Sequence, residues 1–175
     1  MLRRCGSAPS RDYAGIGDGR TGAVVGRDGS IDWLCLPNAD SGSVFGRILD
    51  AERGGSFRLE PVEPFESERR YREGSNVLET TFRTDDGDVR VTDCMPLRGA
   101  TVDIVREVEG LSGRVPMHME LVVRFDYGSI VPWVYDSNAG FRPVAGPDAL
   151  VVRTPPPTHG RGTITVAAVV VVAGG

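Results

Sequence analysis

Lysine is absent from this chain of 175 residues, and all 20 basic side chains are arginine. The absence excludes a Schiff-base lysine and the lysine of a phosphate-binding P-loop, and with them two large classes of enzyme. The net charge of −4 argues against nucleic-acid binding, since proteins that bind nucleic acids usually carry a basic face. We therefore expect no nucleic-acid partner.

Histidine and cysteine are scarce. The two histidines, His118 and His159, lie far apart in the sequence, and none of the three cysteines belongs to a C-x-x-C pair. Zinc sites need closely spaced ligands of these types, so we predict no metal site. The acidic run at residues 85–88 lacks the spacing and the closing glutamate of a calcium loop. The G-x-S-x-G motif of serine hydrolases is also missing.

Long apolar segments are missing as well. The longest apolar run, residues 166–173, is too short to span a bilayer. Residues 1–13 include basic side chains but have no apolar core, unlike a secretory signal. We therefore expect a cytoplasmic protein with no membrane partner, in which Cys5, Cys35 and Cys94 stay reduced.

Most segments alternate between apolar and polar residues, which is the period of a β-strand. The clearest is 115–125, and residues 76–84 and 89–95 flank an Asp-Gly turn that predicts a hairpin. The 23 glycines and 12 prolines supply the many turns that such a fold needs. The sequence predicts an all-β protein, a large antiparallel β-sandwich. At most one short helix is expected, near residues 43–50, where apolar residues at helical spacing follow a serine cap.

Gly17, Gly19 and Gly22 form a G-x-G-x-x-G motif, which in dinucleotide-binding proteins joins a strand to a helix. Here the motif leads into an apolar triplet, a turn at residues 26–29 and an alternating segment at 30–36. This order predicts a hairpin, because the phosphate-binding role needs a helix that opens on the last glycine. We therefore expect no nucleotide and no other cofactor.

The chain resembles one known family over most of its length. The resemblance is carried by the segments 16–18 (IGD), 25–37 (VGRDGSIDWLCLP), 40–41 (DS), 44–50 (VFGRILD), 69–80 (RRYREGSNVLET), 89–98 (VRVTDCMPLR), 104–128 (IVREVEGLSGRVPMHMELVVRFDYG) and 131–134 (VPWV). These segments are similar to the N-terminal region of bacterial glycoside hydrolase family 15 proteins, both glucoamylase-like and trehalase-like. The resemblance runs from about residue 13 to about residue 165.

The resemblance implies an N-terminal β-sandwich that a helical linker joins to an (α/α)6 barrel. In the family, two glutamates of the barrel hydrolyse α-glucosidic bonds with inversion, as general acid and general base. We expect residues 1–12 to be an atypical tail and residues 13–175 to be a single β-sandwich domain, C-terminally truncated and without the barrel. The chain departs from the family pattern at Gly19 and Gly22, which create the glycine motif, and at 38–39, where the family tends to have Arg-Phe.

The chain alone is then predicted to be inactive and to contain no catalytic residue. Its expected role is to support and pack on the barrel, which is supplied in cis or by an adjacent gene. An α-glucoside substrate would be bound only through that barrel. The choice between trehalose, maltose and longer α-glucans stays open, because it is made outside this chain.

Two loops, residues 32–41 and 124–133, are expected to face the barrel, because their polar and aromatic residues lie at strand ends, where sites are commonly built. The candidates for a substrate rim or barrel interface are Asp32, Trp33, Asp40, Ser41, Arg124, Asp126, Tyr127 and Trp133. The alternative for the three aspartates of this set is that they bond backbone N–H groups in turns.

Two other functions stay open at this point. A stand-alone carbohydrate-binding sandwich would present Trp33, Tyr127, Trp133 and Tyr135 on one flat face, and it would fail if both tryptophans were fully buried. An inactive gene fragment is the other alternative. It is favoured by the valine-rich run at 166–173, whose composition is typical of aggregation-prone segments.

Overall fold

The computed structural model describes residues 10–97, 99, 101–137, 140–153, 159–161 and 164–172, and most of these lie in β-strands. The strands are β1 (Tyr13–Gly17), β2 (Gly22–Gly26), β3 (Ser30–Cys35), β4 (Ser43–Phe45), β5 (Ser56–Pro61), β6 (Glu66–Tyr71), β7 (Leu78–Thr84), β8 (Gly87–Cys94), β9 (Val105–Val122), β10 (Trp133–Ser137), β11 (Gly140–Ala145), β12 (Asp148–Ala149), β13 (His159–Arg161) and β14 (Ile164–Val172). A 3-10 turn, Ser10–Asp12, precedes β1, and the first nine residues of the predicted tail lie outside the described part. Within that part, no helix is long and apolar enough to cross a membrane.

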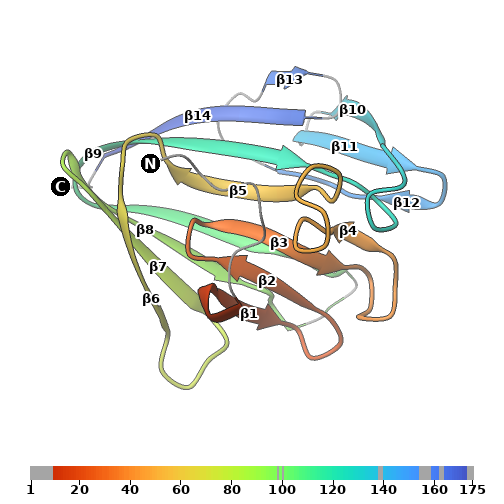
Figure 1. Cartoon of the computed structure of the whole chain (residues 1–175), viewed down its shortest axis with the longest axis horizontal. Helices are drawn as coiled ribbons and strands as arrows, with labels where there is room; N and C mark the ends of the chain where they lie inside the picture. The colour runs from red at the N-terminus through yellow and green to blue at the C-terminus, as the bar shows by residue number, and fades with distance from the viewer. Residues whose placement is uncertain are drawn as a thin grey trace.

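Eleven strands form one antiparallel sheet that curls over on itself (Figure 1). Its main path runs β1-β2-β3-β5-β9-β8-β7-β6. The long strand β9 pairs with β8 through its first half, and with β5 and β14 through its second half. One strand therefore belongs to both layers, and the prediction of an all-β antiparallel sandwich is confirmed.

The two edge strands of the main path, β1 and β6, meet where the sheet curls. The Tyr71 hydroxyl of β6 accepts a hydrogen bond from the Gly15 amide of β1 at 3.1 Å and donates one to the Gly15 carbonyl at 2.8 Å. Beside it, Arg69 Nη1 donates to the Val25 carbonyl at 2.9 Å. Side chains thus join the two edges of the sheet, which are not paired through their backbones.

The apolar alternation of β9 fills both halves of the interior. Val115 and Met117 are buried in one apolar cluster together with Phe82 of β7. Further along the same face, Leu121 is buried in a second cluster that also contains Ile31 of β3. The strand predicted at 115–125 is only the second half of β9, a single strand of 18 residues that ends at Val122.

A buried ion pair between two neighbouring strands also reaches across the interior. Arg106 of β9 and Asp93 of β8 are directly paired across the two strands, and their side chains are 3% and 1% exposed. The guanidinium contacts Asp93 Oδ1 from Nε at 2.7 Å and donates from Nη1 to the Phe57 carbonyl at 2.8 Å. It also donates from Nη2 to the Gly29 carbonyl at 2.7 Å. Arg106 therefore ties β8 to β5 and to the β2–β3 turn.

The glycine motif forms a hairpin, as predicted. Gly17 ends β1 and pairs with Gly22, which begins β2, and Gly19 lies in the turn with a φ of 89°. The following β2–β3 turn depends on Gly29, whose φ is 75°. A Cβ at Gly29 would lie 2.3 Å from the Leu59 carbonyl oxygen, so the close approach of the turn to β5 needs glycine.

The short helix that the sequence allows near residues 43–50 does not form. Ser43–Phe45 is strand β4, which pairs with β3, and a turn follows. The Arg47 and Ile48 amides donate to the distant carbonyls of Gly55 and Asp32, both at 3.2 Å. A bond from the Asp50 amide to the Gly46 carbonyl, also at 3.2 Å, closes a single turn that does not continue into a helix. Gly46 has a poor intrinsic helix propensity, so little helix stability is lost when this segment forms a strand and a turn.

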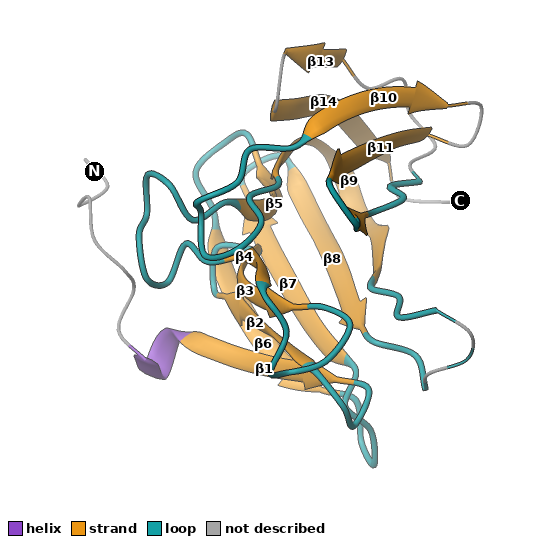
Figure 2. Ribbon diagram, turned by 90° about the vertical axis from the view of Figure 1, so that its right-hand side faces the viewer, coloured by secondary structure: helices purple, strands orange, loops and turns teal. Residues whose placement is uncertain are grey.

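A second, three-stranded sheet consists of β10, β11 and β12. Both views place β10 and β11 near β14, away from β6 (Figure 2). The inner face of this sheet joins the main core through Phe141, which is 3% exposed, and through Val134 and Ala145. The outer face of this sheet therefore does not pack against the core.

Candidate functional site

Parts of the two stretches singled out from the sequence, 32–41 and 124–133, lie close together. These parts belong to the β3–β4 loop, residues 36–42, and to the loop at residues 123–130 that follows β9. The link between them is Ser43, which is fully buried. Its carbonyl accepts from the Asp126 amide at 2.9 Å, and its Oγ accepts from the Tyr127 amide at 2.9 Å. We call these two loops, together with Ser43, the loop cluster.

The tip of the second loop is held in an unusual backbone conformation. Asp126 and Tyr127 have φ values of 50° and 57°, and Gly128 continues with 92°. Mutual backbone hydrogen bonds between Phe125 and Ile130, at 3.0 and 3.1 Å, close the loop below the tip. A left-handed conformation costs a bulky residue such as tyrosine roughly 1–3 kcal/mol, and it persists only where neighbouring contacts fix it.

Aromatic and basic side chains surround the loop cluster. The rings of Trp33 and Tyr127 are 6.0 Å apart between centroids, with a tilt of 37°. Tyr127 is half exposed, so this pair reaches the surface. Burial lowers the pKa of the Arg124 guanidinium, which donates to the Val123 carbonyl at 2.8 Å.

A cleft of about 820 Å³ lies beside the loop cluster. Pro37 and Ser41 line it from the first loop, and Asp126 and Ile130 line it from the second. Residues 101–103 and 147–151 complete the lining. The cleft is therefore bounded by four segments that are far apart in the sequence, which is the usual construction of a binding site on a rigid scaffold.

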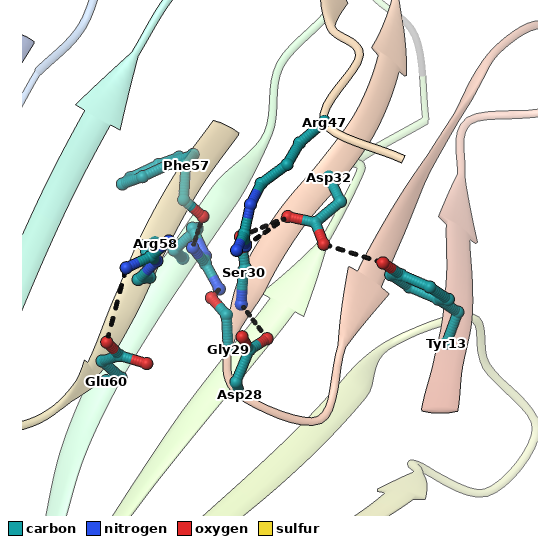
Figure 3. Close-up of polar contacts among 10 residues, drawn as sticks. Tyr13, Asp28, Gly29, Ser30, Asp32, Arg47, Phe57, Arg58 and Glu60 are labelled. Atoms are coloured by element: carbon teal, nitrogen blue, oxygen red, sulfur yellow. Dashed lines mark hydrogen bonds and ion pairs between the residues drawn. The ribbon is translucent and has the colours of Figure 1, made fainter. Parts of the chain in front are cut away.

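The Asp32 carboxylate bonds to side chains of neighbouring segments within the sheet (Figure 3). Its Oδ2 accepts a hydrogen bond from the Tyr13 hydroxyl at 2.9 Å, and its Oδ1 accepts one from the Ser30 hydroxyl. Arg47 Nη1 pairs with Oδ1 at 3.4 Å. With 5% of the residue exposed, the carboxylate joins β1, β3 and the turn after β4 and does not face the cleft.

The eight predicted site residues therefore differ in whether they lie at the loop cluster. Trp33, Ser41, Arg124, Asp126 and Tyr127 belong to the loop cluster or border it, and Asp40 is exposed in the first loop. Asp32 has a structural role, and Trp133 lies on the separate β10 sheet. Of the three aspartates, Asp32 bonds side chains and Asp126 accepts from the Ser129 hydroxyl at 3.0 Å.

Sequence reasoning missed the residue that joins the loops. Ser43 was expected only to cap a helix, whereas its backbone and its hydroxyl hold the tip of the second loop. The local pattern, a serine followed by Val44 and Phe45, gives no sign of a partner 84 positions away.

The described residues offer little for metal or thiol chemistry. No three His, Cys, Asp or Glu side chains among them gather closely enough to hold a metal ion. Cys35 and Cys94 are free, and burial raises the pKa of both thiols, which disfavours the reactive thiolate. Cys5 lies outside the described residues.

Comparison with known proteins places the domain. A family model described as "Trehalase-like, N-terminal" matches residues 7–165. The chain is 35% identical to a trehalase of Mycobacterium tuberculosis over 152 residues, which cover 75% of this chain and 22% of that protein. It is 36% identical to trehalase 1 of Sulfolobus acidocaldarius, over 73% of this chain and 22% of that protein.

A trehalase of Thermoplasma volcanium is 34% identical over 76% of this chain and 23% of its own length. The chain thus spans less than a quarter of the length of these curated relatives. No solved structure matches significantly. The family match and the similarity to these trehalases show that the chain belongs to the trehalase-like N-terminal domain family.

Proposed function

We propose that this domain is the non-catalytic N-terminal part of a glycoside hydrolase family 15 enzyme of trehalase or glucoamylase type. Such an enzyme hydrolyses α-glucosidic bonds with inversion, and its acid and base would lie in an (α/α)6 barrel. The proposal is supported by the relatives named trehalase, of which this chain matches less than a quarter. The barrel would be supplied in cis or by an adjacent gene.

The loop cluster is the part of the domain that we assign to the rim of the active site or to the barrel interface. The observation that carries this assignment is the meeting of two distant loops at the buried Ser43, beside a cleft of about 820 Å³. The paired rings of Trp33 and Tyr127 give this surface an apolar platform with polar tips. A sugar at the mouth of the barrel could be bounded by such a surface.

The most buried glutamate of the domain is held in ion pairs, in keeping with a supporting role. This residue, Glu79, accepts from Arg70 Nε at 2.9 Å and from Arg72 Nη2 at 2.9 Å. The free thiols Cys35 and Cys94 are compatible with our proposal that the enzyme works in the cytoplasm.

Trehalose hydrolysis tests the proposal in two steps. The purified chain is expected to show no turnover of trehalose or maltose. A chimera is then made in which this domain replaces the matched region of the Mycobacterium tuberculosis trehalase, and trehalose turnover is expected from it. Turnover by the chain alone would refute the non-catalytic role.

Variants of the chimera test the loop cluster. Tyr127→Ala and Asp126→Ala change exposed residues and should raise KM or lower kcat at least fivefold. Glu109→Gln, on the exposed ion pair with Arg90 of β8, is the matched control and should leave both constants unchanged. If the loop variants behave like Glu109→Gln, the loop cluster has no part in the active site.

A further inference from the structure

The outer face of the β10–β11 hairpin carries two exposed aromatic rings in a row. Trp133 is 77% exposed and Tyr135 is 58% exposed. The two residues alternate with Val134 on one strand, so their side chains leave the same face, about 7 Å apart along the strand. Direct strand pairing adds Val144 opposite Trp133 and Arg142 opposite Tyr135. We call these four side chains the aromatic face.

The aromatic face does not serve the fold. The residues that attach the second sheet to the core, Phe141 and Val134 among them, point the other way. Two large rings exposed side by side cost solvation free energy, and exposed apolar patches on soluble domains usually mark an interaction site. The guanidinium of Arg142 makes no hydrogen bond or ion pair with any residue that the structure describes, so its donors are available.

We propose that the aromatic face binds a neutral oligosaccharide of two or more pyranose rings. The C–H face of one ring would stack on the Trp133 indole and that of the next on the Tyr135 phenol, because aromatic rings offer an apolar body with a polar edge. The Tyr135 hydroxyl and the Arg142 guanidinium would donate hydrogen bonds to the sugar hydroxyls. Arg142 is the only charged side chain of the four, and stacking on the two rings requires no charge on the sugar.

Area favours a saccharide over a protein partner. Two aromatic side chains bury at most roughly 150–250 Å² each, whereas a stable protein interface needs about 800 Å² on each partner. The aromatic face alone therefore falls short of a protein interface but matches the size of a short sugar chain. This inference does not depend on the proposed role of the loop cluster, because it uses residues of a different sheet.

The test uses the purified chain with maltoheptaose as the probe. The chain has two tryptophans, so fluorescence reports on Trp33 and Trp133 alone among the indoles. Titration should change the emission of the wild-type chain and of Trp33→Phe. Calorimetry should show binding weakened at least tenfold in Trp133→Ala and in Tyr135→Ala, and weakened in Arg142→Ala.

Val62→Ala is the matched control, because Val62 is 58% exposed and apolar but lies outside both the aromatic face and the cleft beside the loop cluster. It should bind maltoheptaose like the wild type. Circular dichroism should show an unchanged fold for all variants, since the mutated side chains point outward. Wild-type affinity in Trp133→Ala, or no heat of binding at millimolar maltoheptaose with the wild type, would overturn the proposal.

A third outcome identifies a protein interface instead. Hydroxyl-radical labelling read by mass spectrometry should still modify Trp133 in the chimera with the trehalase if the face is free to bind sugar. Protection of Trp133 from labelling in the chimera, with full labelling in the chain alone, would show that the catalytic region covers the face and would refute the saccharide site.

Discussion

Removing the Arg106 side chain is the perturbation whose effect the structure predicts most directly. In Arg106→Leu, the Asp93 carboxylate, 1% exposed, would keep its buried position without its partner. The carbonyls of Phe57 and Gly29 would each lose a charge-assisted hydrogen bond of 2.7–2.8 Å. Breaking a buried ion pair from one side costs about 3–5 kcal/mol, because an uncompensated charge remains in the interior.

The expected loss is a large share of the total stability. Domains of this size unfold with about 5–15 kcal/mol, and each kcal/mol moves the Tm by roughly 2–4 °C. Arg106→Leu should therefore lower the Tm by about 6–20 °C. Urea titration followed by circular dichroism gives the free energy of unfolding from the midpoint and the slope.

Two further variants separate the buried charge from other causes. Glu109→Gln breaks the pair with Arg90, in which the two side chains are 58% and 27% exposed, and should cost less than about 1 kcal/mol. The double variant Arg106→Leu, Asp93→Leu removes both charges and should recover part of the loss. A loss in Arg106→Leu no larger than that of Glu109→Gln, or a double variant less stable than the single one, would refute the reasoning.

Three more outcomes follow from single residues. Ser43→Ala leaves the Tyr127 amide without its acceptor and should cost about 1–3 kcal/mol in urea titration; an unchanged midpoint would mean that water replaces the hydroxyl. The hydrogen bonds from its two arginine partners lower the pKa of the Glu79 carboxyl, so its stabilisation is present above the unfolded pKa of about 4.3 and is lost as pH falls through the folded value. Glu79→Gln should flatten the acid limb of a plot of stability against pH, and an unaltered limb would contradict this. Gly29→Ala meets both a positive φ and the Leu59 carbonyl at 2.3 Å, whereas Gly19→Ala meets only a positive φ, so Gly29→Ala should lower the Tm more; equal Tm values would contradict the steric argument.

Local patterns in the sequence were enough to predict several strands and their turns. The alternation that begins at Val115 and the Asp-Gly turn between β7 and β8 are decided by neighbours along the chain, and both are confirmed, although the strand ends at Val122. The glycine motif was separated from a nucleotide loop by the strand that follows it. These features need no knowledge of distant residues.

The features that were missed depend on distant residues. Residues 43–50 have helical spacing, but pairing of β4 with β3 decides their conformation. Asp93 shares its strand face with Val89 and Val91, so an acid at an inward position was visible in the sequence. Its partner Arg106 became evident only from the register of β8 against β9. For the candidate site, the sequence named the loops that meet but not Ser43, which joins them.

The continuity of β9 has a consequence for how the domain unfolds. Its second half supplies buried side chains to two separate apolar clusters, Val115, Met117 and Met119 to one and Leu121 to the other. In another architecture these clusters could melt one after the other. Here, loss of packing in either cluster would also loosen β9, and β9 carries side chains of the other cluster. Disorder in one cluster therefore destabilises the other as well. The domain is therefore built to behave as a single cooperative unit, with one thermal transition in place of two.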